Sequence, residues 1–146
     1  MYPIFQHAHS GLRWLVLLGL VAAVINAFVK WRKGVAASER DRKLGFFAMM
    51  FVHIQLLLGL VLFFISEKVI FSGESMKVAM NRFFLVEHPS MMILAIILIT
   101  VGYSRAKKAT TDAAYFRRLF WFYAVGLILV LLGIPWPSQG YGTGWF

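Results

Sequence analysis

Four long apolar blocks constrain this chain more than any other feature of its sequence. A bilayer core about 30 Å thick needs about 20 mostly apolar residues for each helical span. Segments 11–29, 44–66, 83–103 and 120–135 meet this requirement, the last with the least length. Because 60% of the 146 residues are hydrophobic and only 14% are charged, the chain carries more apolar surface than a soluble domain buries. We predict a single all-α integral membrane domain over residues 1–146, a four-transmembrane up-down helix bundle.

The placement of charge predicts the orientation of these spans. Segment 30–43 holds six basic and two acidic residues, and segment 104–118 holds five basic residues and one acidic residue. Segment 67–87, between the second and third spans, holds three of each sign. Both basic segments lie on the same side of the membrane, which the positive-inside rule makes cytoplasmic. We therefore expect both termini on the non-cytoplasmic side of a bacterial inner membrane. The net charge of +9 then reflects topology and lipid contact rather than nucleic-acid binding.

Cysteine does not occur in the sequence. Disulfides, thiolate metal ligands and iron–sulfur clusters held by this chain are therefore excluded. The first apolar block is followed, not preceded, by a basic cluster, so we expect the first span to remain as an anchor rather than to be cleaved as a signal peptide.

Several residues between the spans predict where helices begin and end. Gly34 and Ser38 are expected to cap helices or turn the chain in the first basic loop. Pro89 is expected in the first turn of the third span, where a helix tolerates proline. Thr111 is expected to cap a short amphipathic lead-in to the fourth span.

Few ionisable side chains lie in or beside the spans, and each is a functional candidate because charge in lipid is costly. They are His9 and Arg13 in the first span, His53 in the second, and Glu87 and His88 in the third. The first and third spans run in the same direction, so His9 and His88 are expected at similar depth near the outer surface. In an up-down bundle these two spans are diagonal partners.

This pair of histidines predicts the axial ligands of a haem. Adjacent helices pack about 8–10 Å apart, so diagonal helices are roughly 14 Å apart. That gap suits a flat macrocycle gripped by an imidazole from each side, and haem iron accepts axial histidine ligands. Arg13, one helical turn below His9, is placed to pair with a haem propionate because guanidinium binds carboxylate bidentately.

The second span adds candidate pocket residues. Gln55 and Gly59 lie one turn apart and share a face, and a small residue there admits either a cofactor or a close helix neighbour. His53 lies deeper and points about 160° away from Gln55, so both cannot face one narrow site. We expect His53 to face a partner subunit, a quinone or a buried hydrogen-bond acceptor.

Two other ligand sets are compatible with these residues. The seven methionines offer a sulfur axial ligand, although methionine more often fills irregular gaps in a core. His7, His9, Glu87 and His88 offer a copper or zinc site, since imidazole suits both metals. Because residues i and i+2 diverge on a helix, that metal site requires irregular backbone around His7 and His9.

The order of these residues resembles one half of the haem A synthase family, whose two homologous halves are four-helix units. In each half a histidine with a nearby arginine is followed by a Gln-x-x-x-Gly pattern, then by a helix that opens with histidine and has an alanine beyond. The corresponding residues here are His9 with Arg13, Gln55 with Gly59, and His88 with Ala95. The resemblance implies one b-type haem bound by His9 and His88 near the outer face. A synthase uses two halves, so a homodimer would be needed to rebuild the second one.

Together these arguments predict a membrane b-type cytochrome that binds one bis-histidine haem b and transfers electrons. It would be an electron carrier or redox subunit rather than a stand-alone enzyme. His9 and His88 would be the metal ligands, with Arg13, Gln55 and Gly59 also in the cofactor site. The expected partners are the lipid bilayer, a redox partner subunit or quinone, and a second copy of the chain. Two alternatives stay open: a haem- or metal-dependent oxidoreductase acting on quinone or lipid, and a cofactor-free assembly subunit.

Overall fold

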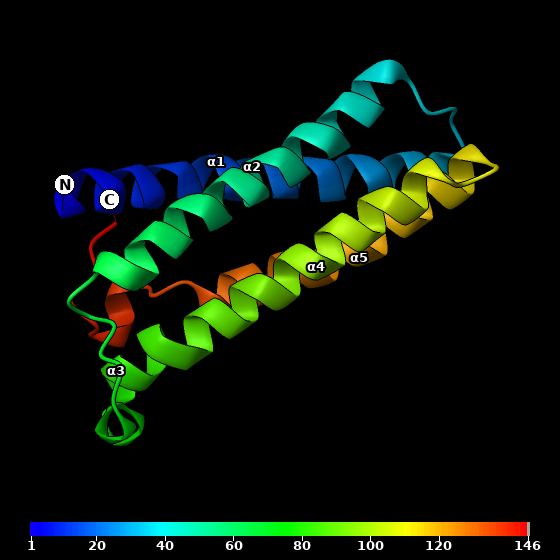
Figure 1. The fold of residues 1–146 in the computed structure, drawn as a ribbon. Coiled ribbons are helices and arrows are strands. Elements are labelled where there is room, and N and C mark those ends of the chain that lie inside the picture. The colour runs from blue at the N-terminus through cyan, green and yellow to red at the C-terminus, as the bar shows by residue number, and fades with distance from the viewer. Residues whose placement is uncertain (146) are drawn as a thin grey trace.

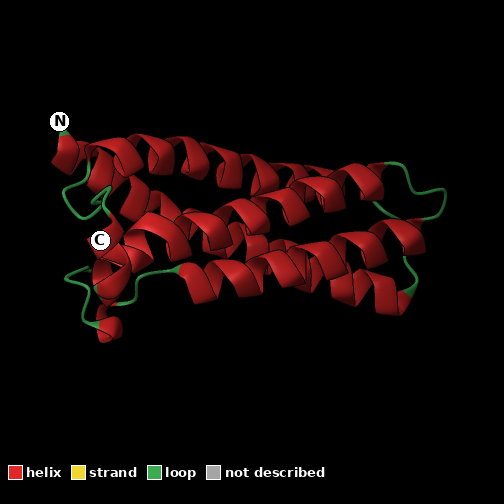
Figure 2. Cartoon of the chain, turned by 60° about the horizontal axis from the view of Figure 1, so that its bottom comes forward, coloured by secondary structure: helices red, strands yellow, loops and turns green. Residues whose placement is uncertain are grey.

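The structure is a computed structural model that describes residues 1–145. All regular secondary structure in this range is helical (Figure 2). The long helices are α1 (Tyr2–Lys33), α2 (Glu39–Ile65), α4 (His88–Lys107) and α5 (Asp112–Gly133) (Figure 1). The short elements are the 3-10 turn η1 (Gly73–Lys77), helix α3 (Ala79–Arg82), the π-helical turn η2 (Phe83–Glu87) and the 3-10 turn η3 (Pro137–Gln139).

Four helical stretches of the described chain are long and apolar enough to cross a membrane. Three of them are α1, α2 and α5, and the fourth joins α3, η2 and α4 into one stretch, Ala79–Lys107. Many large apolar side chains on their outer faces are exposed, as lipid-facing residues must be; Leu18 and Leu57 are examples, at 67% and 63% exposure. The predicted four-helix membrane bundle is confirmed.

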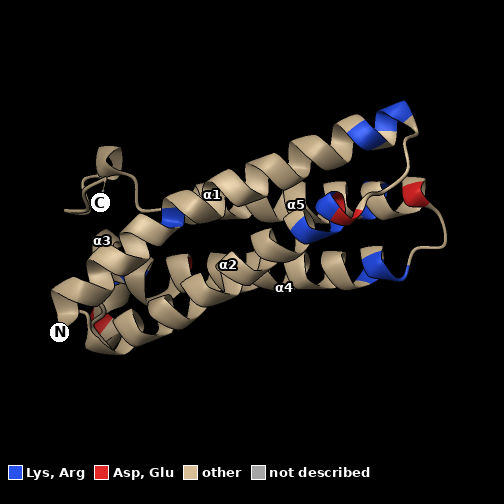
Figure 3. Ribbon diagram, turned by 90° about the horizontal axis from the view of Figure 1, so that it is seen from above, with Lys and Arg blue, Asp and Glu red and all other residues tan. Residues whose placement is uncertain are grey.

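The helices pack in an up-down order around the bundle. α1 contacts α2 and α5, and α4 contacts the same two helices, so α1 and α4 are diagonal partners, as predicted. Both termini lie at one end of the bundle, which we call the terminal end (Figure 1). The α1–α2 and α4–α5 loops lie at the other end, where most Lys and Arg residues gather (Figure 3). We call it the basic end.

Cap residues end the helices where the sequence predicts. Gly34 ends α1 in the left-handed conformation, with φ of 64°, which glycine adopts without steric cost. Ser38 caps α2 and Thr111 caps α5, each through a side-chain oxygen that accepts from a backbone N–H three residues on. α5 runs unbroken from Asp112, so the predicted lead-in is the first part of this helix rather than a separate one.

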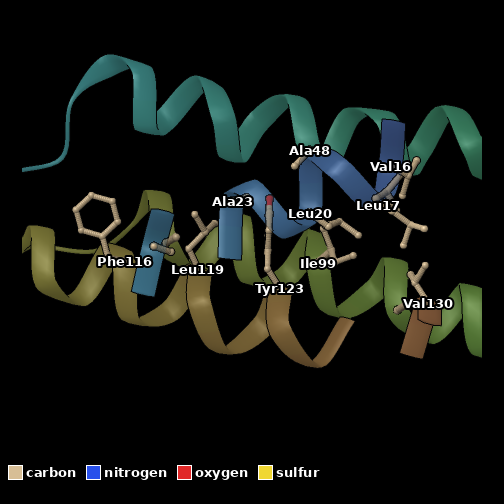
Figure 4. Close-up of a cluster of buried hydrophobic side chains, with 14 of the residues drawn as sticks. Val16, Leu17, Leu20, Ala23, Ala48, Ile99, Phe116, Leu119, Tyr123 and Val130 are labelled. Carbon is tan, nitrogen blue, oxygen red and sulfur yellow. The ribbon is translucent and has the colours of Figure 1, made fainter. Parts of the chain in front are cut away.

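The buried core lies in the middle of the bundle and toward the basic end (Figure 4). Leu20 from α1, Ile99 from α4 and Tyr123 from α5 are fully buried there. The Tyr123 hydroxyl crosses the bundle and donates a hydrogen bond to the Gly45 carbonyl of α2 at 2.7 Å. Gly126 lets α5 approach α4 closely, because a Cβ there would lie 2.7 Å from an Ile99 carbon.

A buried carboxylate fastens α1 to α2 at the basic end. Asp41 is 4% exposed and accepts hydrogen bonds from Asn26 Nδ2 at 2.9 Å and Lys30 Nζ at 2.6 Å. It also accepts from the backbone N–H and the hydroxyl of Ser38, at 2.8 and 2.6 Å. One side chain therefore closes the α1–α2 loop, caps α2 and neutralises a lysine.

We predict that Asp41→Asn destabilises the bundle by about 1–3 kcal/mol, because a neutral amide in place of the buried carboxylate cannot pair with the Lys30 ammonium and accept from three further donors. Thermal unfolding of the detergent-solubilised protein, followed by circular dichroism, measures the loss. Glu39→Gln is the matched control, since the Glu39 carboxylate pairs only with Lys43 and is 79% exposed. Equal stability of the two variants would contradict the role given to Asp41.

Candidate cofactor-binding site

Two histidines face each other across the terminal end of the bundle. His9 comes from α1 and His88 from α4, the diagonal pair. Their ring centroids lie 6.4 Å apart, and the ring planes are inclined by 74°. The two histidines thus lie at the same depth, as the directions of the two spans predict.

This separation suits two imidazoles that share one metal ion. A metal–imidazole bond is about 2 Å long and a ring nitrogen lies about 1 Å from its ring centroid, so two axial imidazoles have centroids roughly 6 Å apart. Two rings in direct edge contact also lie between about 4.5 and 7 Å apart, so the observed distance fits either arrangement. The distance therefore permits an axial pair without any movement of α1 or α4.

His88 is oriented by the end of α5. Its Nδ1 lies 2.6 Å from the Gly133 carbonyl oxygen, so Nδ1–H donates and the Nε2 lone pair is left to bind a ligand. Gly133 is the last residue of α5, and the residue four positions on, which would supply the next helical donor, is Pro137. Because proline has no N–H, this carbonyl stays available to the histidine.

A π-helical turn lies immediately before His88. Phe83–Glu87 forms this turn, and the His88 N–H bonds to the Phe83 carbonyl, five residues back. Pro89 has no N–H to continue the α-helical pattern, so the wider turn absorbs the break. Pro89 is the second residue of α4, in its first turn as predicted, and the helical stretch also continues back through η2 and α3 to Ala79.

His9 is held mainly through its backbone. Gln55 Nε2 donates to the His9 carbonyl at 2.8 Å, which ties α2 to α1. A Cβ on Gly59 would lie 3.2 Å from His9 Cε1, so glycine leaves room for the imidazole. The Nδ1 atom of His9 is buried and has no partner among the described residues.

A cavity of about 290 Å³ surrounds the histidine pair, near the lower end of the range for ligand pockets. It is walled by all four long helices, the α2–α3 loop and the C-terminal segment 135–144, and most of its lining is apolar. The predicted site residues all line it: His9, Arg13, Gln55, Gly59 and His88. The structure therefore gathers this set, while the role of each residue in binding stays a prediction.

Unsatisfied polar atoms gather at the same cavity. Four buried side-chain atoms in the described chain have no hydrogen-bond partner, and three belong to His9, Arg13 and Gln55. Arg13 is 8% exposed; its Nη2 donates to the Trp145 carbonyl at 2.6 Å while its Nε is unpaired. Unpaired buried atoms are rare in folded proteins, and a cluster of them points to a missing ligand.

Part of the cavity wall was not predicted from the sequence. Lys68, in the α2–α3 loop, lines the cavity, as do Thr143 and Gly144 of the C-terminal segment. Lys68 Nζ donates to the Tyr141 and Gly142 carbonyls at 3.2 and 2.8 Å. No periodic pattern marks such residues, because irregular backbone brings them together. The only signal in the sequence is that Lys68 has no acidic residue three or four positions away to pair with.

The alternative metal set does not assemble. His7 is exposed, and Glu87 pairs with Arg82 at 2.7 Å. Within residues 1–145 no three His, Asp or Glu side chains lie close enough together to hold a metal ion. Met92 does line the cavity, so a sulfur near the site is available.

His53 lies apart from the cavity and joins α2 to α4. Its Nδ1 lies 2.9 Å from the Met49 carbonyl, and its Nε2 lies 3.2 Å from the Thr100 hydroxyl. The Thr100 hydroxyl also donates to the Ile96 carbonyl at 2.7 Å. The structure thus gives His53 a hydrogen-bond acceptor, the Met49 carbonyl, in partly buried surroundings, while a partner subunit or quinone beside it stays a prediction.

Comparisons with protein-family models, with curated proteins and with solved structures found no match. The function is therefore argued from the residues of this cavity. A helix bundle as such would leave the chemistry open, because one fold hosts many unrelated functions.

We predict that Gly59→Ala displaces the His9 imidazole, because the added methyl group would press on Cε1 at 3.2 Å. Gly19→Ala is the matched control, since it also adds a methyl group between α1 and α2 but at an ordinary 3.6 Å from Ala48. Nuclear magnetic resonance of protein carrying ¹⁵N in its histidine rings reports the change. The His9 ring signals should shift only in Gly59→Ala; unchanged signals in both variants would contradict the contact.

Proposed function

We propose that this chain is a membrane b-type cytochrome that binds one haem b between His9 and His88 and transfers electrons. The observation that supports it best is the 6.4 Å separation of the two imidazoles across a buried cavity. Haem supplies reversible one-electron chemistry at its iron when bound. Two axial histidines leave no open position on the iron, which favours electron transfer over reaction with oxygen.

Each residue of the site would have a different role in binding haem. His88 presents Nε2 because Nδ1 is committed to the Gly133 carbonyl. Gln55 fixes the backbone that carries His9, and Gly59 leaves space for its ring. Arg13 brings a buried guanidinium to the cavity, where a propionate carboxylate would pair with it. The apolar walls exclude water from the centre.

The basic end would face the cytoplasm of a bacterial cell, with both termini on the other side of the inner membrane. The charge of the two loops at that end supports this orientation through the positive-inside rule. The haem would then lie near the outer face. Electrons would be exchanged with a membrane quinone or a partner subunit. The order of the motifs supports a relationship to one half of the haem A synthase family.

We predict that His9→Ala and His88→Ala each lose most bound haem, because each removes one axial ligand. The visible spectra of the oxidised and reduced detergent-purified proteins, with haem quantified per chain, measure this. The unsubstituted chain should give a sharp reduced b-type spectrum that carbon monoxide does not change.

His7→Ala and His53→Ala serve as controls, since neither residue lines the cavity, and both should keep their haem. Full haem retention in both ligand variants would refute the assignment. A spectrum that responds to carbon monoxide would favour the oxidoreductase alternative, and a colourless protein made with ample haem would favour a cofactor-free subunit.

The orientation has its own test, which the cysteine-free sequence makes simple. Gly73→Cys places a thiol in the α2–α3 loop at the terminal end, and Ala36→Cys places one in the loop at the basic end. In spheroplasts a membrane-impermeant maleimide should label Gly73→Cys and should label Ala36→Cys only after lysis. The reverse pattern would invert the proposed topology.

A further inference from the structure

Two cations line the cavity without any acidic partner. Arg13 and Lys68 are both part of its wall, and none of the lining residues is Asp or Glu. Neither cation takes part in an ion pair within residues 1–145. Their recorded acceptors are backbone carbonyls of the C-terminal segment: Trp145 for Arg13, and Tyr141 and Gly142 for Lys68.

Such an arrangement leaves positive charge uncompensated. A buried or partly buried cation is normally paired with a carboxylate, because a neutral acceptor only partly replaces lost hydration. Burial lowers the pKa of the Lys68 ammonium, so the site disfavours the charged lysine as it stands. Arg13 also keeps an unpaired Nε. An anion in the cavity would neutralise the charge of both side chains and could accept a hydrogen bond from the Arg13 Nε.

The two cations lie on the same wall. They bind the C-terminal segment at Gly142 and at Trp145, which are three residues apart. Three residues span at most about 11 Å, so the two acceptor sites are neighbours. A ring contact also holds this segment, because Tyr141 packs on Phe83 with a centroid distance of 4.8 Å.

We propose that Lys68 is a second carboxylate-binding residue of the site, and that Lys68 and Arg13 together select a tetrapyrrole with two carboxylates, one for each cation. The proposal rests on haem binding as proposed above. Haem b carries its two propionates on one edge of the ring, which suits two cations on one wall. A carboxylate adds the attraction of opposite charges to the hydrogen bond, which a neutral carbonyl lacks, so it displaces the carbonyls of the C-terminal segment from these donors.

The test compares haem with its dimethyl ester, which has the same ring and iron but no carboxylate charge. Protein purified from cells grown with limiting haem is titrated with each compound, and binding is followed by the visible spectrum. The unsubstituted chain should prefer haem over the ester by about 100-fold. Lys68→Met should bind haem about tenfold more weakly and bind the ester as before.

Lys77→Met is the matched control. Lys77 lies in the same stretch between α2 and α3, pairs with Glu74 at 2.9 Å and is not part of the cavity wall. It should keep the full preference for haem. A second readout is the midpoint potential, which should fall in Lys68→Met because removing a positive charge disfavours the reduced state, and should not fall in Lys77→Met.

The outcomes separate the two proposals. If the unsubstituted chain binds neither compound, the cytochrome assignment fails and this inference fails with it. If it binds haem but Lys68→Met keeps the full preference over the ester, the carboxylate-binding role of Lys68 is overturned and the cytochrome assignment stands. An equal loss of haem and ester in Lys68→Met would show that Lys68 only holds the C-terminal segment, and would also overturn that role.

Discussion

Inside a bilayer no water completes a hydrogen bond, so every polar group must find its partner in the chain or in something the chain binds. Most of this bundle meets that demand internally. The Tyr123 hydroxyl reaches a carbonyl of α2. His53 uses both ring nitrogens between α2 and α4. Three of the four exceptions in the described chain collect at one cavity at the terminal end, and this concentration singles the cavity out as the candidate site.

The two ends of the bundle therefore have different tasks. In the middle and toward the basic end, small residues bring helices together, as Gly126 does for α4 and α5 and Gly19 does for α1 and α2. Those contacts fix the directions of the helices. At the terminal end α1 and α4 meet across the cavity through the rings of His9 and His88. A ligand can enter between these rings without disturbing the packed half, because the stability of the bundle resides elsewhere.

Features that depend on residues close together in the sequence could be predicted, and features that depend on distant residues could not. Apolar block lengths set the four spans, and caps such as Ser38 and Thr111 act within three residues, so both could be read in advance. The shared depth of His9 and His88 followed from counting residues in spans that run the same way. The π-helical turn before Pro89 could not be foreseen, because it depends on how the break is absorbed in three dimensions. Lys68 reaches its acceptors across more than 70 residues of irregular chain, which leaves no periodic trace.

The two histidines are held in different ways, and this difference follows from the helix ends around them. α5 stops at Gly133, and Pro137 cannot supply the next donor, so a carbonyl is released toward His88 and fixes its ring. His9 sits inside a continuous helix, where no carbonyl is released, and only its backbone is tied, by Gln55. The His88 ring is thus oriented by a side-chain hydrogen bond, whereas the buried Nδ1 of His9 has no partner among the described residues. The tautomer of His88 is thereby fixed, whereas no hydrogen bond in the described chain fixes that of His9, so the two imidazoles differ although they lie at the same depth.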